Sequence, residues 1–158
     1  MSKWAVIGVD AGVSTGLALR VQGDENVHTA TVLFPKDFST TGQARTCVRS
    51  LDYIQEWIDD RISINMNLLF SVELFRQYAG SVSATSATTS AQWIHAQMVA
   101  YYTREYEDRA HWCRFTAGTA KSSVTDQRLK DRGLWIAGND QRHVRDALRV
   151  MVLGEKKL

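Results

Sequence analysis

Four side chains stand at positions where they could bind divalent cations. Asp10 ends the apolar run KWAVIGVD, and Glu73 comes near the end of a second run, NLLFSVEL. His143 and Asp146 are three residues apart, which places both on one face of a helix. Hard divalent cations prefer oxygen ligands and keep open positions for water and substrate phosphate. Two such ions, roughly 3.5–4 Å apart, clamp the attacking and leaving oxygens of a phosphodiester, so these residue types suit metal-dependent phosphodiester chemistry.

Each of these residues also has a simpler interpretation when it is taken alone. Asp10 precedes the turn AGVS and would serve as a turn-capping residue. Glu73 would be a strand-end acid that reaches water. His143 and Asp146 would lie on a solvated helix face. The metal interpretation depends on all four converging, and Asp140 is predicted to be the N-cap of the last helix.

The hydrophobic pattern predicts an α/β fold. Short apolar runs bounded by turn residues favour strands, and apolar residues at steps of three and four favour helices. The Ser/Thr-rich stretch 81–90 is either a loop or the start of a helix. Three antiparallel strands followed by alternating strands and helices predict a mixed sheet with helices on both faces. The expected strands are 3–10, 15–21, 27–34, 67–74 and 111–115, and the expected helices are 41–61, 91–106, 121–132 (ending at Gly133) and 140–153.

Length and composition indicate a single domain over residues 1–158. Apolar residues make up 44% and charged residues 23%, as in ordinary globular proteins. The net charge is +2, but the last 55 residues hold 12 Lys/Arg against 8 Asp/Glu, which points weakly to a polyanionic partner. Cys47 and Cys113 form no CxxC motif, so reduced thiols are expected. No run resembles a signal peptide or a membrane span, so a cytoplasmic protein without membrane contact is predicted.

The segments GVDAGVSTGLAL, VELF and HVRDAL resemble, in this order, motifs of the RuvC family of Holliday-junction resolvases, which are ribonuclease H-like nucleases. The segment AKSSVTDQRLKDRGLW adds to the resemblance to the phage-type members. This resemblance implies that the protein acts in the cytoplasm of a bacterial cell or of a phage-infected host. The resemblance implies that Asp10, Glu73, His143 and Asp146 hold Mg²⁺ or Mn²⁺, with two ions in each site. The partner one turn before the last acid is Asp in some members and His in others. Lys121 resembles a lysine near the scissile phosphate, although an exposed helix-start lysine is the alternative.

Branched DNA, especially the four-way junction, is the substrate that the resemblance implies. Family members open the junction with an aromatic residue after the fourth strand, for which Phe75 and Tyr78 are the candidates here. Arg76 would add phosphate contacts. Resolution needs two cuts while one chain supplies one set of ligands, so a homodimer is expected, with Trp57 and Trp93 as candidate anchors.

Two other functions stay open at this point. A ribonuclease H-like nuclease could act on RNA–DNA hybrids, nicks or flaps, and the same fold could serve as a non-catalytic nucleic-acid-binding module. The run DAGVSTG also resembles the first phosphate loop of the actin and sugar-kinase ATPases. Those enzymes need a second lobe that 158 residues cannot supply, so no nucleotide cofactor is expected.

Overall fold

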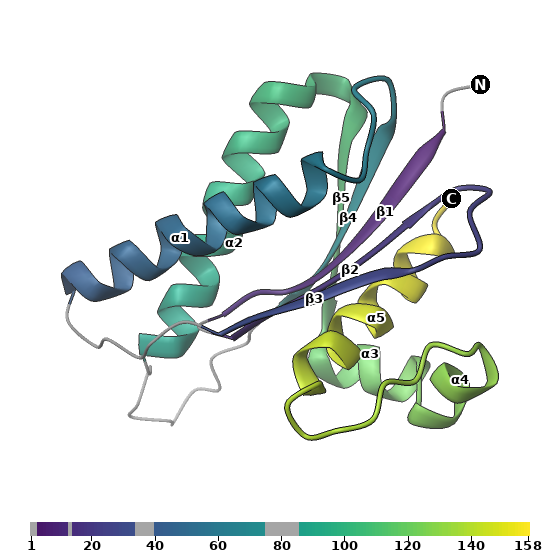
Figure 1. The fold of residues 1–158 in the computed structure, drawn as a ribbon. Coiled ribbons are helices and arrows are strands. Elements are labelled where there is room, and N and C mark those ends of the chain that lie inside the picture. The colour runs from purple at the N-terminus through teal and green to yellow at the C-terminus, as the bar shows by residue number, and fades with distance from the viewer. Residues whose placement is uncertain (1–2, 13, 34–39, 75–85) are drawn as a thin grey trace.

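The computed structural model describes residues 3–12, 14–33, 40–74 and 86–158. Five strands form one sheet, in the order β3-β2-β1-β4-β5 (Figure 1). The strands are β1 (Trp4–Asp10), β2 (Ser14–Val21), β3 (His28–Leu33), β4 (Asn67–Leu74) and β5 (Ala110–Thr116). The helices are α1 (Thr40–Asp59), α2 (Ser86–Tyr106), α3 (Ala117–Ser123), α4 (Asp126–Asp131) and α5 (Arg142–Glu155), with a 3₁₀ turn at Glu107–Arg109.

The sheet is mixed, as the sequence pattern predicted. β1, β2 and β3 pair antiparallel, whereas β1, β4 and β5 run parallel to one another. β1 is central, and Val9 of β1 lies opposite Val72 of β4. The next residues along these two strands, Asp10 and Glu73, therefore fall side by side at the carboxyl ends of parallel strands, where open α/β sheets place their ligands.

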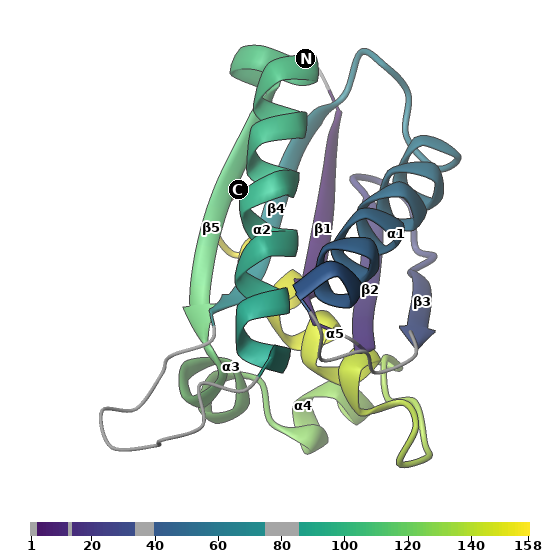
Figure 2. The same ribbon diagram turned by 90° about the vertical axis from the view of Figure 1, so that its left-hand side faces the viewer.

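Helices cover both faces of the sheet (Figures 1 and 2). α1 and α2 pack on one face, where Ile54 and Met98 belong to the same buried cluster as Ile7 and Phe70. α5, with α3 and α4 beside it, covers the other face through a second cluster that includes Val6 and Ala147. Successive side chains of a strand alternate between the two faces of the sheet. Val6, Gly8 and Asp10 of β1 therefore all lie on the face that α5 covers.

Small residues let α5 approach the sheet backbone closely. A Cβ added at Gly16 would lie 2.0 Å from the carbonyl oxygen of His143, and one at Gly8 would lie 2.1 Å from that of Ala147. A Cβ at Gly154 would lie 2.9 Å from the Cβ of Ser71. The amino-terminal half of α5 is thereby pressed against β1 and β2, which sets the position of every side chain that this helix directs toward Asp10.

The predicted helix 121–132 is wrong in one respect, because the structure has two short helices there. Val124 leaves the helical conformation (φ −125°, ψ 83°), and Thr125 is extended and caps α4 by accepting a hydrogen bond from the backbone N–H of Arg128. An N-capping threonine competes with continuation of the preceding helix. The predicted stop at Gly133 is confirmed, since Gly133 adopts φ 68° directly after α4.

Two further expectations are corrected. Asp140 does not cap α5, because the helix begins at Arg142 and its N-cap is Gln141. The carboxylate of Asp140 instead accepts a hydrogen bond from Nε2 of Gln141, at 2.9 Å. Trp57 is only 6% exposed because it lies on the apolar side of α1, so it is a core residue rather than a surface anchor, whereas Trp93 is 37% exposed.

Helix α2 begins at Ser86, before the predicted start at residue 91, so residues 86–90 of the Ser/Thr-rich stretch are helical. The remaining residues of that stretch, 81–85, lie outside the described part of the chain. In the described ranges, no helix is long and apolar enough to cross a membrane.

Candidate active site

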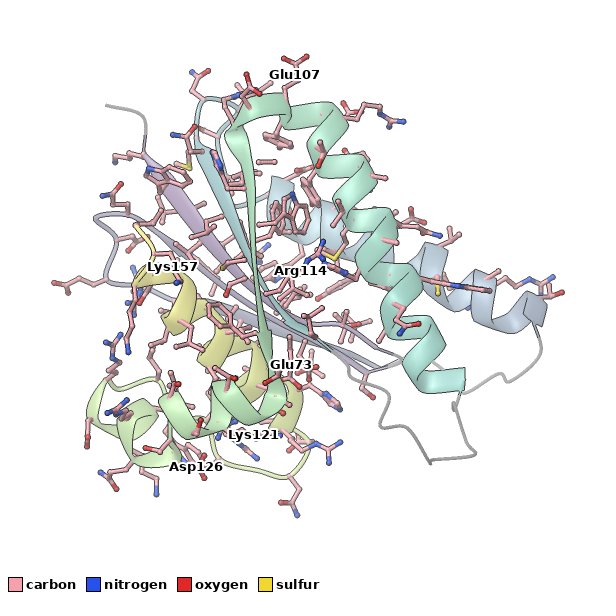
Figure 3. The ribbon with its side chains drawn as sticks, turned by 180° about the vertical axis from the view of Figure 1, so that it is seen from behind. Glu73, Glu107, Arg114, Lys121, Asp126 and Lys157 are labelled. Atoms are coloured by element: carbon pink, nitrogen blue, oxygen red, sulfur yellow. The ribbon has the colours of Figure 1, made fainter. Side chains whose placement is uncertain are left out.

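Two carboxylates meet at the end of the central strands. Asp10 is 2% exposed and Glu73 is 7% exposed, and both lie on the sheet face that α5 covers. Figure 3 shows Glu73 at the end of the sheet nearest to α3. Asp10 and Glu73 are thus two buried acids on adjacent parallel strands, an arrangement that is costly unless a cation or hydrogen bonds compensate the charges.

Helix α5 adds the other two predicted residues. His143, in the first turn of the helix, places Nδ1 2.6 Å from Oδ2 of Asp10. Asp146 is 4% exposed and lies one turn further along α5. The structure therefore places all four residues that the sequence singled out near one another, with His143 hydrogen-bonded to Asp10 and with the charges of the three acids close enough to interact.

Two cations contact Asp146. Arg149 Nη1 donates to Oδ1 of Asp146 at 2.6 Å, and Lys121 Nζ lies 3.5 Å from Oδ2. Lys121, on α3, thus lies at the site rather than serving only as an exposed helix-start residue (Figure 3). Sequence reasoning missed Arg149. The available signal was an arginine three residues after Asp146, within the predicted apolar helix, because a buried guanidinium requires acceptors.

The electrostatics of the site disfavour full ionisation. Burial is the main cause that raises the pKa of Glu73 to about 7, and the charges of Asp10 and Asp146 add to it, opposed by Lys121 and Arg149. Burial also raises the pKa of Asp10, against the hydrogen bond and charge of His143. Oε2 of Glu73 is buried and has no hydrogen-bond partner among the described residues. An additional cation at this point would relieve both the repulsion and the unsatisfied oxygen.

The residues present fit a hard divalent cation by their chemistry. The set comprises three carboxylates and one imidazole, and the oxygens match the preference of Mg²⁺ and Mn²⁺. As arranged, no three His, Cys, Asp or Glu side chains of the described residues form a group that could hold an ion. Asp10 instead points one oxygen at His143, and Asp146 turns its two oxygens to Arg149 and Lys121. The unpartnered Oε2 of Glu73 is the feature that most directly fits a bound cation.

The predicted DNA-contact residues follow β4 in the sequence. Phe75, Arg76 and Tyr78 lie outside the described residues and stay predictions.

The raised pKa of Glu73 predicts how stability changes with pH in the absence of divalent ions. Between pH 4.5 and about 7, the folded protein binds a proton at Glu73 that the unfolded chain has lost, so stability falls as the pH rises through this window. Chemical unfolding in chelator is expected to show Glu73→Gln more stable than wild type above pH 7, by on the order of 3 kcal/mol. Equal stability of the two proteins at pH 8 would show that ionisation of buried Glu73 does not destabilise the fold.

Comparison with solved structures places this arrangement in a known fold. The RuvC structure of Thermus thermophilus superposes with a TM-score of 0.58 at 16% identity, over 94% of this chain and 91% of that one. T. thermophilus RuvC in complex with a Holliday-junction substrate gives 0.56 at 15%, over 96% and 91%. The yeast mitochondrial Holliday-junction resolvase Ydc2 gives 0.59 at 12%, over 95% and 76%. No family model and no curated protein matches the chain. The likeness that the sequence motifs indicated is therefore confirmed at the level of structure, and the chain has the RuvC-type, ribonuclease H-like fold.

Proposed function

We propose that this chain is a metal-dependent endonuclease that cuts phosphodiesters in Holliday junctions or other branched DNA by paired nicks. The observation that carries the proposal is the convergence of three buried carboxylates, Asp10, Glu73 and Asp146, at one end of the sheet. The fold neighbours add support, because they include a Holliday-junction resolvase and a RuvC in complex with a Holliday-junction substrate.

Asp10, Glu73, His143 and Asp146 would hold Mg²⁺ or Mn²⁺, with two ions in each site. When bound, such ions lower the pKa of a water molecule and stabilise the charge that develops on the phosphodiester. The contact from Asp10 occupies Nδ1 of His143, which leaves Nε2 as the nitrogen available for other ligands. Because ligands must be deprotonated, Glu73 has to lose its proton, so metal binding and activity should increase with pH, with a midpoint at or below about 7 because a bound cation lowers the pKa of Glu73.

Lys121 would bind the scissile phosphate. Its side chain is 52% exposed, and its ammonium group lies beside Asp146 at 3.5 Å. A cation at the mouth of an acidic site lets a polyanion approach carboxylates that would otherwise repel it. Lys121 thus combines access to solvent with direct contact to the proposed centre.

Paired nicks require two active sites. Asp10, Glu73, His143 and Asp146 each supply one side chain to one site, so a single chain makes one cut at a time. A two-fold homodimer would match the near two-fold symmetry of a four-way junction. Of the two tryptophans considered as anchors, Trp93 keeps an exposed surface for such an interface.

A non-catalytic binding module is disfavoured by the same carboxylates. Binding to nucleic-acid phosphates would require neither Glu73 nor Asp10, and keeping buried acids close together without a cation costs free energy. The acids also weaken attraction to a polyanion at this end of the sheet. Their retention is understandable where a cation completes the site.

A panel of synthetic substrates tests the function. A four-way junction, an RNA–DNA hybrid, a flap, a nicked duplex and an intact duplex, all of related sequence, are incubated with wild-type protein in Mg²⁺, Mn²⁺ or chelator. We expect the junction to be cut fastest, only with metal, and on two opposed strands. Preferential cutting of the hybrid, the flap or the nicked duplex would identify the alternative nuclease, and binding without cutting would identify a binding module.

A further inference from the structure

Arg149 is a buried cation that the proposed chemistry does not use, and it joins three separate segments. The residue is 7% exposed. Nη1 donates to Asp146 at 2.6 Å, Nε donates to the carbonyl oxygen of Val124 at 3.0 Å, and Nη2 donates to Oδ1 of Asp126. A guanidinium presents its donors in a rigid planar fork, so three simultaneous contacts fix the relative position of their acceptors.

Two of the three acceptors, Val124 and Asp126, lie outside α5. Val124 is the C-cap of α3, and Asp126 is in the first turn of α4. Helix α3 carries Lys121, whose ammonium group lies 3.5 Å from Oδ2 of Asp146. Arg149 thus contacts one oxygen of Asp146 directly and anchors the helix whose lysine contacts the other.

We propose that Arg149 and Asp126 form a clamp that positions α3, and with it Lys121, against the site. The clamp consists of Arg149 and its acceptors on Val124 and Asp126. The inference rests on the proposed function, since it assigns Lys121 to the reaction and Arg149 to the placement of Lys121. Arg149 is a positioning residue, because its contacts are to Asp146, Val124 and Asp126 rather than to the substrate side.

Exposure of Asp126 makes the clamp testable without disturbing the interior. The side chain of Asp126 is 55% exposed, whereas that of Arg149 is 8% exposed. Arg149→Met would leave the carboxylate of Asp146 without its buried arginine partner and is expected to destabilise the fold strongly, so a loss of activity in that variant would not be informative. Asp126→Ala removes one arm of the clamp from the solvent side and leaves the contact of Arg149 with Asp146 in place.

Asp131 on the same helix provides a matched control. It is an exposed carboxylate at the end of α4, and its Oδ1 accepts a hydrogen bond from Gln127 Nε2 at 2.7 Å. In single-turnover cleavage of a four-way junction, Asp126→Ala is expected to slow the reaction about 10-fold, since small misplacements of a site residue cost up to about 100-fold. Asp131→Ala is expected to stay within about two-fold of wild type, and junction affinity in chelator is expected to be unchanged in both variants.

The double variant with Lys121→Met separates positioning from general destabilisation. If the clamp acts through Lys121, Asp126→Ala should cause no further loss of rate in a Lys121→Met background. A full additional 10-fold loss in that background, or equal rates for Asp126→Ala and Asp131→Ala, would overturn the proposal.

Amide hydrogen exchange provides a reading that needs no activity. Asp126→Ala is expected to increase exchange over 117–131 and to leave α1 unchanged, while Asp131→Ala should leave 117–125 unchanged. Unchanged exchange at 117–125 in Asp126→Ala would also overturn the clamp. If the wild-type protein cuts no junction, the proposed function fails, and the exchange measurement still decides whether Asp126 and Arg149 hold α3.

Discussion

Asp146→Asn is expected to lower the rate of junction cleavage by at least about 100-fold while leaving junction binding intact. The change removes the negative charge of Asp146, which is only 4% exposed. It also replaces a carboxylate, the kind of ligand that hard divalent cations prefer, with a neutral amide that binds them poorly. Asn keeps an oxygen that can accept the hydrogen bond from Arg149, so the fold should be retained. Binding should persist because affinity comes from phosphate contacts, and it should weaken with salt in both proteins.

Single-turnover cleavage in Mg²⁺ and gel-shift titration in chelator measure these two quantities for Asp146→Asn. Asp131→Asn is the control, because it makes the same chemical change on an exposed acid of α4. Cleavage by Asp146→Asn at the wild-type rate would remove Asp146 from the active site. Parallel loss of binding and cleavage would instead indicate that the fold has been damaged.

Gly8→Ala is expected to destabilise the protein strongly. The added Cβ would lie 2.1 Å from the carbonyl oxygen of Ala147 and 2.8 Å from Cβ of Met151, which forces α5 away from β1. Overpacking of this kind costs about 3 kcal/mol, and more where backbone must move. Because α5 carries both His143 and Asp146, the displacement should also reduce cleavage by more than the loss of folded protein explains.

Gly118→Ala provides the matched control for this substitution. Gly118 lies in α3, and its added Cβ would meet only Oγ1 of Thr116, at 3.9 Å. Alanine is a better helix former than glycine, so this variant should gain up to about 1 kcal/mol. Urea unfolding of the two variants provides the comparison. A Gly8→Ala protein within about 1 kcal/mol of wild type would show that the close approach of α5 is not required.

The four proposed ligands could be predicted from sequence because each stands at a recognisable position. Asp10 and Glu73 come at the ends of apolar strands that pair in parallel around β1, and the spacing of His143 and Asp146 is one helical turn. The mixed sheet followed from the order of strands and helices. These features depend on local sequence patterns and on general rules of chain topology, so they can be predicted without knowledge of the tertiary structure.

Other features depend on contacts that no local pattern encodes. Trp57 reads as a possible interface residue, but the packing of α1 on the sheet buries it. The division of 121–132 into two helices depends on Thr125 capping α4 and on Val124 turning its carbonyl to Arg149, a residue 25 positions away. The clamp could not be predicted for the same reason, since Arg149 lies on α5 and its acceptors, Val124 and Asp126, belong to the C-cap of α3 and to α4, which meet α5 only in the folded chain.

Cleavage of a four-way junction, compared with cleavage of a linear duplex, tests the central proposal most directly. Wild-type protein in Mg²⁺ is given a four-way junction and, separately, a linear duplex of the same arm sequence, and the initial rates are compared. We expect the junction to be cut at least about 100-fold faster than the linear duplex, on two symmetrically related strands, and we expect chelator to stop the reaction. Equal rates on junction and duplex, or cutting that persists in chelator, would contradict it.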